Sequence, residues 1–550
     1  MLKFENNNSY KTNNSELQGG SSSFSGSNHL QDGRFERDSK FRNCFNRFNI
    51  KTFKFSGNKN KSLSTGGIPL GRVNSEQVLV DNSDSHTLVI GATGSKKSRL
   101  VIMPSVYILG AAGESMIISD PKAEIYSRTA GYLKKEGYDL VVINLRDPKT
   151  CQAWNPLAIP YSFYKSGDID RAYEFANDVA FNLTQAEKDL HDPYWDNSAG
   201  DLFFGLAILL FKYVYSNNYS EEYVNLYNLI RLRRYLFRDT SSTRINDLYM
   251  RELVDSDEII AGSLSGTVTA PDKTKTSILS VFDEKMRCFI LQPSLLEMLS
   301  NNSVNLHTSI GKKIAVFLII PDEKTTYHKL ASLFIKQSYE YLIFEAQKTA
   351  DGQLPLRVNF ILDEFSSLPT IKDFPNMVSA ARSRNIRFVL VIQSKHQIVE
   401  RYREESETIR SNCTNWIFLT SRELPLLMDI SSLCGKNKSG RELASISALQ
   451  HLNKEKGQSL VLSGRLLPYI AELIDVNEYD NNKYDAQIMN IEERKQYLLS
   501  SFECVEQQVH KRGHPIITSV NDENYDIYAE LEKKFDELFG DNSDKEDKNG

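Results

Sequence analysis

Cysteine is scarce and scattered in this chain of 550 residues. The six cysteines form no C-x-x-C pair, and the nine histidines form no cluster at metal-ligand spacing. These absences exclude a disulfide framework and a structural zinc site, and they favour reduced thiols in a cytosol. No apolar core follows a basic start at the N-terminus, so we expect no secretory signal.

Long hydrophobic runs are also missing. The longest run, Leu202 to Phe211, has ten residues. That is about half of the ~20 residues that a membrane-spanning helix needs. We therefore expect a buried helix at this position and no transmembrane anchor in the chain.

The net charge of −5 is small, but the charge is unevenly distributed. Residues 1–62 carry eleven Lys and Arg against five Asp and Glu, which gives +6. Residues 521–550 carry four against eleven, which gives −7. The two ends are either interaction arms or solvated chain ends. With 40% hydrophobic and 25% charged residues, the composition is that of a globular protein rather than a disordered or coiled-coil one.

Short apolar runs alternate with helical patterns from about residue 68 onward. Continuous apolar strands with helices between them are typical of a parallel sheet covered on both faces, so we predict an α/β fold. The predicted strands are Thr87–Gly91, Ser115–Ser119, Asp139–Leu145, Lys313–Ile320, Val358–Asp363, Arg387–Gln393, Trp416–Thr420 and Ser459–Leu462.

The pattern divides the chain into four parts. Residues 1–66, rich in Asn, Ser and Gly, predict a disordered basic leader. Residues 67–154 and 311–475 together predict the α/β domain. Residues 155–310 show helical periodicity and predict a mostly all-α insertion. Residues 476–550 form a mixed, polar C-terminal segment with an acidic tail.

The sharpest local signal is an eight-residue loop between a predicted strand and a predicted helix, Gly91-Ala92-Thr93-Gly94-Ser95-Lys96-Lys97-Ser98. It follows the phosphate-binding pattern G-x-x-x-x-G-K-[ST] except at the second glycine. In such a loop the backbone amides wrap the β-phosphate and the helix N-terminus adds its dipole. Lys97 would reach the β- and γ-phosphate oxygens, and the Ser98 hydroxyl would hold Mg²⁺.

Lys96 occupies the position of the second glycine. Glycine is usual there because the backbone approaches the phosphate closely. Two alternatives follow. Lys96 points outward and leaves a working site with one more positive charge, or the loop is remodelled and its nucleotide chemistry is weak or lost.

Polar residues near later strand ends support a nucleotide site. Asp363 and Glu364 end an apolar strand, where Asp363 would hold Mg²⁺ through water and Glu364 would polarise the attacking water. The alternative is an acidic strand end at a surface turn. Gln393 ends the next strand and would sense the γ-phosphate. Arg382 and Arg384 end the intervening helix, where they would act in trans on a neighbouring protomer's nucleotide or merely cap the helix.

With these residues and further motifs, the chain resembles the type IV secretion coupling proteins, the motor ATPases of bacterial conjugation. The resemblance runs from about Thr87 to Cys434, with weaker traces to about Asp475. Besides the loop, it is carried by Asp120-Pro121-Lys122-Ala123-Glu124, Asn155-Pro156, Asp192-Pro193-Tyr194-Trp195 opening a long helix, Lys275-Thr276-Ser277-Ile278-Leu279-Ser280 preceding a helix, Ile320-Pro321-Asp322, Asp363-Glu364-Phe365, and Arg382-Ser383-Arg384 with Gln393.

The resemblance implies a RecA-like nucleotide-binding domain, interrupted by an all-helical domain, that assembles as a homo-hexamer and uses ATP with Mg²⁺. It also implies that the protein recruits the relaxase complex to the secretion channel and drives single-stranded DNA outward by ATP hydrolysis. Family members commonly begin with two transmembrane helices, which this sequence lacks. A cytoplasmic protein at the inner face of the membrane, held there by an anchoring partner, is therefore expected.

Two other functions stay open. Lys96 is compatible with a degenerate loop protein that binds nucleotide and recruits cargo without turnover, although the intact Asp363-Glu364 pair argues against it. A related ring motor with protein or double-stranded DNA as cargo is the third hypothesis.

Two basic stretches are candidates for DNA contact. Basic and aromatic residues alternate in the leader, which suits single-stranded DNA or anionic lipid; these are Arg34, Arg37, Lys40, Arg42 and Arg47 with Phe35, Phe41, Phe45 and Phe48. The second stretch is Arg231, Arg233 and Arg234 in the insertion, for which we favour a solvated helix face.

Overall fold

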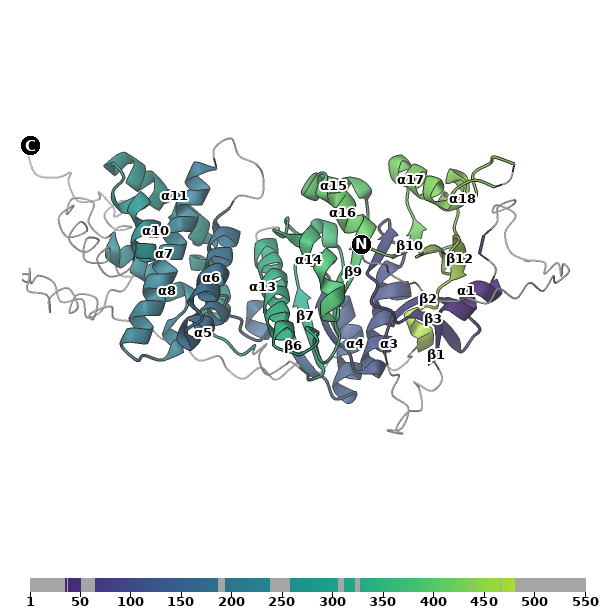
Figure 1. Cartoon of the computed structure of the whole chain (residues 1–550), viewed down its shortest axis with the longest axis horizontal. Helices are drawn as coiled ribbons and strands as arrows, with labels where there is room; N and C mark the ends of the chain where they lie inside the picture. The colour runs from purple at the N-terminus through teal and green to yellow at the C-terminus, as the bar shows by residue number, and fades with distance from the viewer. Residues whose placement is uncertain are drawn as a thin grey trace, which may run out of the picture.

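The computed structural model describes residues 35–36, 38–50, 65–185, 193–237, 258–304, 311–321, 327–437, 439–464 and 466–479. These residues form an α/β part and a helical part, which lie side by side along the long axis of the molecule (Figure 1). The helical part interrupts the α/β part in the sequence, as the helical periodicity predicted.

The strands of the central sheet are β4 (Thr87–Gly91), β5 (Ser115–Ser119), β6 (Asp139–Asn144), β7 (Ile314–Ile319), β8 (Val358–Leu362), β9 (Ile386–Ile392), β10 (Asn415–Thr420), β11 (Gln458–Ser463) and β12 (Tyr469–Glu472). Their order is β12-β11-β10-β4-β9-β8-β5-β7-β6. All pairs from β10 to β6 are parallel, whereas β11 and β12 add an antiparallel edge. The eight predicted strands are confirmed, each within a residue of its predicted ends, and β12 is an additional strand.

Helices cover both faces of this sheet. They are α3 (Met103–Ala112) and α4 (Glu124–Lys135) on one face, and α13 (His328–Gln347), α14 (Phe374–Ala381), α15 (Lys395–Tyr402) and α16 (Glu405–Asn412) on the other. Successive strand residues enter opposite cores: Leu88 and Ile90 pack with α13 and α14, and Val89 packs with α3 and α4. This two-sided burial explains why the strands are continuous apolar runs.

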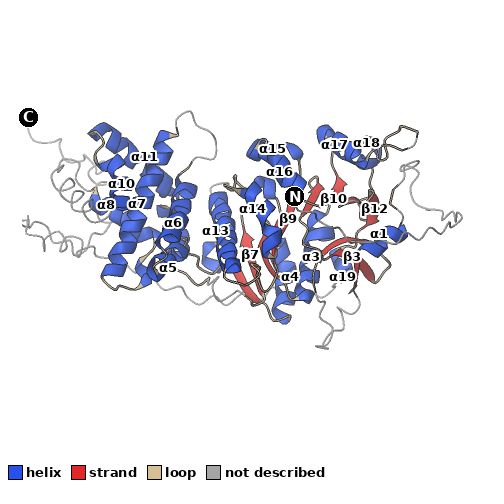
Figure 2. Ribbon diagram, in the orientation of Figure 1, coloured by secondary structure: helices blue, strands red, loops and turns tan. Residues whose placement is uncertain are grey.

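The helical part contains no strand among its described residues (Figure 2). Its helices are α5 (Ala158–Ser166), α6 (Ile169–Thr184), α7 (Tyr194–Ser216), α8 (Leu226–Leu236), α10 (Glu258–Val268), α11 (Asp272–Ile290) and α12 (Pro293–Ser300). The run Lys275–Ser280 lies inside α11, so the expectation that it precedes a helix is wrong.

The longest apolar run lies in the middle of α7. Every residue from Leu202 to Phe211 except Phe204 is buried, which confirms the expected buried helix. Among the described helices, α7 is the one long and apolar enough to cross a membrane, and 72% of its apolar window is buried inside the protein.

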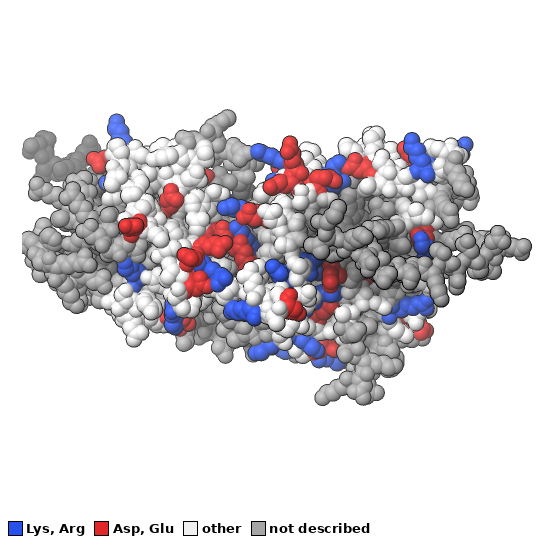
Figure 3. All heavy atoms as spheres, viewed as in Figure 1, with Lys and Arg blue, Asp and Glu red and all other residues white. Residues whose placement is uncertain are grey.

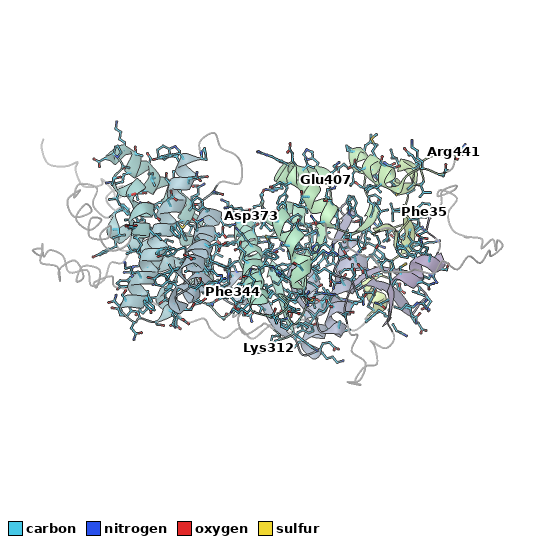
Figure 4. All side chains as sticks on the ribbon, viewed as in Figure 1. Phe35, Lys312, Phe344, Asp373, Glu407 and Arg441 are labelled. Carbon is cyan, nitrogen blue, oxygen red and sulfur yellow. The ribbon has the colours of Figure 1, made fainter. Side chains whose placement is uncertain are left out.

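The helical part meets the α/β part along α13. Figure 4 shows Phe344 of α13 and Asp373 near this junction. The Arg171 guanidinium of α6 lies 4.4 Å from the centroid of the Phe344 ring. Lys336 Nζ lies 2.7 Å from Asp178 Oδ1 of α6 and 3.8 Å from Asp373 Oδ2. Ion pairs and ring contacts therefore join the two parts.

A second, smaller sheet corrects the prediction that the whole of residues 1–66 is disordered. It has the order β1-β3-β2 and is preceded by α1; the elements are α1 (Asp38–Cys44), β1 (Asn46–Asn49), β2 (Ile68–Arg72) and β3 (Gln77–Asp81). Phe41 is fully buried and stacks on Tyr469 at a centroid distance of 3.9 Å. Phe48 is also buried. These aromatic side chains fill a core and do not face a nucleic acid.

A buried arginine fastens this small sheet to the large one. Arg387, at the start of β9, donates to Glu114 Oε2 at 3.0 Å, to Asn359 Oδ1 at 2.7 Å and to the Ser83 carbonyl oxygen at 3.1 Å. Burial lowers the pKa of Arg387, and the Glu114 carboxylate opposes that shift. The amino edge of the sheet is therefore held by buried charges that pair with one another.

Candidate functional site

The predicted phosphate loop connects β4 to a helical segment, a π-helical turn at Ser98–Ile102 that continues into α3. The Ala92 amide donates to the Thr420 carbonyl oxygen at 2.8 Å, which ties the loop to the end of β10. A Cβ atom on Gly91 would lie 2.4 Å from Ser95 Oγ. Glycine at position 91 therefore avoids crowding of the Ser95 and Lys97 side chains.

Lys96 adopts the left-handed conformation that glycine would supply at this position. Its φ is +66°, and that of Gly94 is +77°. For a residue with a Cβ atom this conformation costs about 1–2 kcal/mol. Lys96 Nζ donates to Glu455 Oε2 at 2.7 Å. The turn therefore keeps the positive φ that glycine would adopt, and the Lys96 side chain extends to Glu455.

Lys97 lies on the inner side of the loop and is buried. Its Nζ donates to the Gly91 carbonyl oxygen at 2.6 Å. Burial lowers the pKa of Lys97, and the carboxylates of Asp363 and Glu364 oppose that shift. Asp363 and Glu364, which the sequence predicted to act with Lys97, thus lie close enough to shift its pKa.

Ser98 and Asp363 lie in direct contact. Ser98 Oγ donates to Asp363 Oδ2 at 2.9 Å, and Ser119 Oγ donates to the Asp363 carbonyl oxygen at 2.8 Å. Burial raises the pKa of Asp363, and the hydrogen bond from Ser98 opposes that shift. Mg²⁺ prefers a hydroxyl and a carboxylate from the protein, with water and phosphate oxygens as its other ligands. This donor pair fits such an ion, and no group of three His, Cys, Asp or Glu residues suited to a metal occurs in the described ranges.

A chain of polar side chains links the loop to the acidic strand end. Thr93 Oγ1 donates to Gln393 Oε1 at 2.8 Å, and Gln393 Nε2 donates to Glu364 Oε1 at 3.0 Å. Glu364 itself has a φ of +52°, a strained conformation that is typical of functional positions. β9 lies between β4 and β8, so Gln393 at its end meets both neighbours.

The structure adds a residue to which the sequence gave no role. Asp120 ends β5 beside this group, and its Oδ2 accepts the Tyr126 amide at 2.7 Å at the start of α4. Burial raises the pKa of Asp120 to about 6, and the nearby Asp363 raises it further, against the hydrogen bonds from the α4 amides. The exposed Lys122 follows, and its charge lowers the pKa of Lys97. The D-P-K-x-E pattern marks this segment, but only the strand order brings it to the site.

Arg382 and Arg384 do not join this group. They form a short 3₁₀ turn before β9, at the amino edge of the parallel strands, whereas the loop lies at their carboxyl edge. Arg382 is exposed, and neither guanidinium makes an ion pair with any residue that the structure describes. They cannot contact a nucleotide in their own loop.

Three of the basic residues in the two predicted stretches, Lys40, Arg42 and Arg233, form ion pairs. Arg42 Nε lies 2.9 Å from Asp38 Oδ1, and Lys40 Nζ lies 3.1 Å from Glu36 Oε2. Arg233 is half-buried and pairs with Asp283 of α11 at 2.6 Å, so the prediction of a solvated face is wrong for this residue. Figure 3 shows acidic and basic atoms interspersed over the described part of this face. Other basic residues of the leader, Arg34 and Arg37, lie outside the described residues.

The chain is similar to known proteins over most of its length. A family model described as Type IV secretory system Conjugative DNA transfer matches residues 35–475. The Type IV secretion system-coupling protein VirD4 of Bartonella henselae is 22% identical over 436 residues, which are 76% of this chain and 64% of that protein. The chain thus spans less than two thirds of the length of this relative.

Solved structures show the same fold. The bacterial conjugative coupling protein TrwBdeltaN70, in an unbound form, superposes with a TM-score of 0.53 at 15% identity, covering 85% of this chain and 97% of that one. The plasmid coupling protein TrwB in complex with ADP and Mg²⁺ gives a TM-score of 0.51 at 15% identity, with 83% and 97% covered. The α/β part is therefore the RecA-like domain that the sequence predicted.

Replacement of Asp120 by Asn tests the electrostatics of the site. The pKa of Asp120 is raised in the folded protein, so ionisation of Asp120 opposes folding. The unfolding free energy of the parent protein should therefore fall, relative to Asp120→Asn, as the pH rises from about 4 to about 7. A shift from 3.8 to about 6 corresponds to a relative loss on the order of 3 kcal/mol. Urea unfolding of both proteins without nucleotide or Mg²⁺ measures it, and parallel pH profiles would contradict the assigned burial.

Proposed function

Because the chain belongs to the type IV secretory system conjugative DNA transfer family, we propose that it is a coupling ATPase that drives single-stranded DNA transfer by ATP hydrolysis. The observation that carries the proposal is the meeting of Lys97, Ser98, Asp363, Glu364 and Gln393 at one edge of the sheet. Each has the chemistry that phosphoryl transfer requires of its position.

In this proposal ATP places its phosphates against the amides of the loop Gly91–Ser98. Lys97 is released from the Gly91 carbonyl and neutralises the β- and γ-phosphate oxygens. Ser98 and Asp363 would hold Mg²⁺, which would supply positive charge to the phosphate groups during transfer. Gly91 allows the loop to approach itself closely, and the Lys96 side chain is bonded to Glu455 rather than to the loop.

Glu364 accepts a proton from the attacking water or orients it. Gln393 positions the Glu364 carboxylate through its side-chain amide and senses the γ-phosphate with Thr93 beside it. A protein that only binds nucleotide has no chemical need for this Glu364–Gln393–Thr93 chain. We therefore favour hydrolysis over the recruitment module that binds nucleotide without turnover.

The remaining parts of the proposal come from the family. The chain would assemble as a homo-hexamer at the cytoplasmic face of the bacterial membrane, where it would contact the relaxase complex, the secretion channel and an anchoring partner. Arg382 and Arg384, placed at the opposite edge from their own loop, would reach the nucleotide of a neighbouring protomer and stabilise its transition-state charge. Protein cargo is the alternative use of the same ring.

Steady-state hydrolysis of ATP tests the proposal. The purified protein with Mg²⁺ should turn over ATP faster when single-stranded DNA is present, and Lys97→Ala should lower the rate by about 100-fold or more. Lys165→Ala, an exposed change in the helical part, is the matched control and should keep the parent rate. ATP binding without turnover, with or without DNA, would contradict the motor and support the recruitment module.

A mixing experiment tests the arginine in trans. Lys97→Ala protomers keep Arg382 but lose the nucleotide site, whereas Arg382→Ala protomers keep the site but lose the arginine. Each variant alone should be nearly inactive. An equal mixture should recover up to about a quarter of the parent rate, the share of random interfaces that join both intact halves. No recovery in rings shown to contain both variants would contradict the assignment, and Arg384→Ala in the same mixture separates the two arginines.

A further inference from the structure

The most unusual residue of the phosphate loop is Lys96, since a side chain occupies a left-handed position at which the consensus has glycine. We propose that Glu455 is a positioning residue for this loop. Its carboxylate holds the Lys96 ammonium on the outer side, and the left-handed turn thereby keeps its amides available to a nucleotide phosphate. This inference rests on the proposed nucleotide-binding function.

Glu455 is presented by a firmly built turn between α18 (Ile446–Gln450) and β11. Asn453 Oδ1 accepts the Glu455 amide at 3.0 Å and the Lys456 amide at 3.1 Å. The Gln458 amide returns to the Asn453 carbonyl oxygen at 2.9 Å. The backbone that carries the carboxylate is thus set by its own hydrogen bonds, independently of Lys96.

The turn is also packed against the sheet edge. Gly457 has a φ of +66°, and a Cβ atom there would lie 2.4 Å from the Leu473 carbonyl oxygen. The Leu473 amide donates to the Gly457 carbonyl oxygen at 2.8 Å. Only glycine lets the turn lie this close to the neighbouring segment, so the position of Glu455 over the loop is built into the antiparallel edge.

The charges around Glu455 favour its ionised form. The hydrogen bond from Lys96 lowers the pKa of Glu455, and Lys454 and Arg99 lower it further. Arg99, the second residue of the helical segment that follows the loop, pairs with Asp475 at 2.9 Å. Two acidic residues of the C-terminal part, Glu455 and Asp475, thus form ion pairs with Lys96 and Arg99. Of these two basic residues, only Lys96 lies inside the phosphate-binding turn.

Removal of the carboxylate should affect binding rather than chemistry. Glu455→Gln frees the Lys96 ammonium and withdraws the contact that favours its left-handed conformation. An exposed ion pair of this kind changes an equilibrium by about two- to fivefold. We therefore expect the Kd of an ATP analogue and the KM for ATP to rise by about that factor, with kcat unchanged.

A double-mutant cycle distinguishes this role from a general effect on the fold. In the Lys96→Gly background the turn keeps its conformation without a side chain, because glycine adopts positive φ freely. Glu455→Gln should then have no effect on Kd, and Lys96→Gly should restore the affinity that Glu455→Gln loses. Glu442→Gln, another exposed glutamate of the C-terminal part, is the matched control and should match the parent.

The experiment measures displacement of a fluorescent ATP analogue by ADPNP in Mg²⁺ buffer for the parent and the four variants. Equal Kd values for parent and Glu455→Gln would overturn the inference, as would an equal loss in both backgrounds. A parent that binds no ATP analogue would overturn the proposed function and the inference with it. If the parent and Glu455→Gln both bind the ATP analogue and do so with equal Kd, only the inference is overturned and the proposed function stands.

Discussion

The site depends on one hydrogen bond, from Ser98 Oγ to Asp363 Oδ2, between residues 265 positions apart. It joins the loop after β4 to the end of β8, although β9 lies between these strands. The bond is possible because all three strands are parallel and end at the same edge. β9 also contributes to the site, because Gln393 at its end bonds to Thr93 in the loop after β4 and to Glu364 after β8.

The buried charges at the two edges of the sheet are arranged differently. At the amino edge, Arg387 and Glu114 satisfy each other in a buried pair that fastens the small sheet. At the carboxyl edge, burial raises the pKa values of Asp120 and Asp363, and a neighbouring carboxylate raises each further: Asp363 acts on Asp120, and Glu364 acts on Asp363. Lys97 is the cation beside Asp363 and opposes the rise of its pKa, and carboxylates with raised pKa values are typical of sites that bind a cation such as Mg²⁺.

The sequence predicted the large sheet well, because each parallel strand is an unbroken apolar run between helical patterns. It also predicted the residues at the strand ends, since polar residues there have a recognised chemistry. It did not predict that residues 38–50 fold into a helix and a strand. Phe41 stacks on Tyr469, far along the chain, and Phe48 is buried in the same core. A local composition argument has no access to such a partner.

The ion-pair partners of individual basic residues could not be predicted either, because they also lie far away in the sequence. Arg233 appears in the sequence as one of a basic group, and the structure pairs it with Asp283 on another helix. Lys96 violates a local rule, and its counterpart Glu455 is 359 residues away. Local patterns thus indicate that a position is unusual, whereas the strand order determines what compensates for it.

The central claim is that this loop, with lysine in place of glycine, still serves hydrolysis. The most direct measurement is a single turnover of γ-labelled ATP on Glu364→Gln beside the parent, with bound ATP and released phosphate followed in the same quenched samples. The account predicts that both proteins bind ATP with similar affinity and that only the parent releases phosphate. Phosphate release by Glu364→Gln at the parent rate would contradict it.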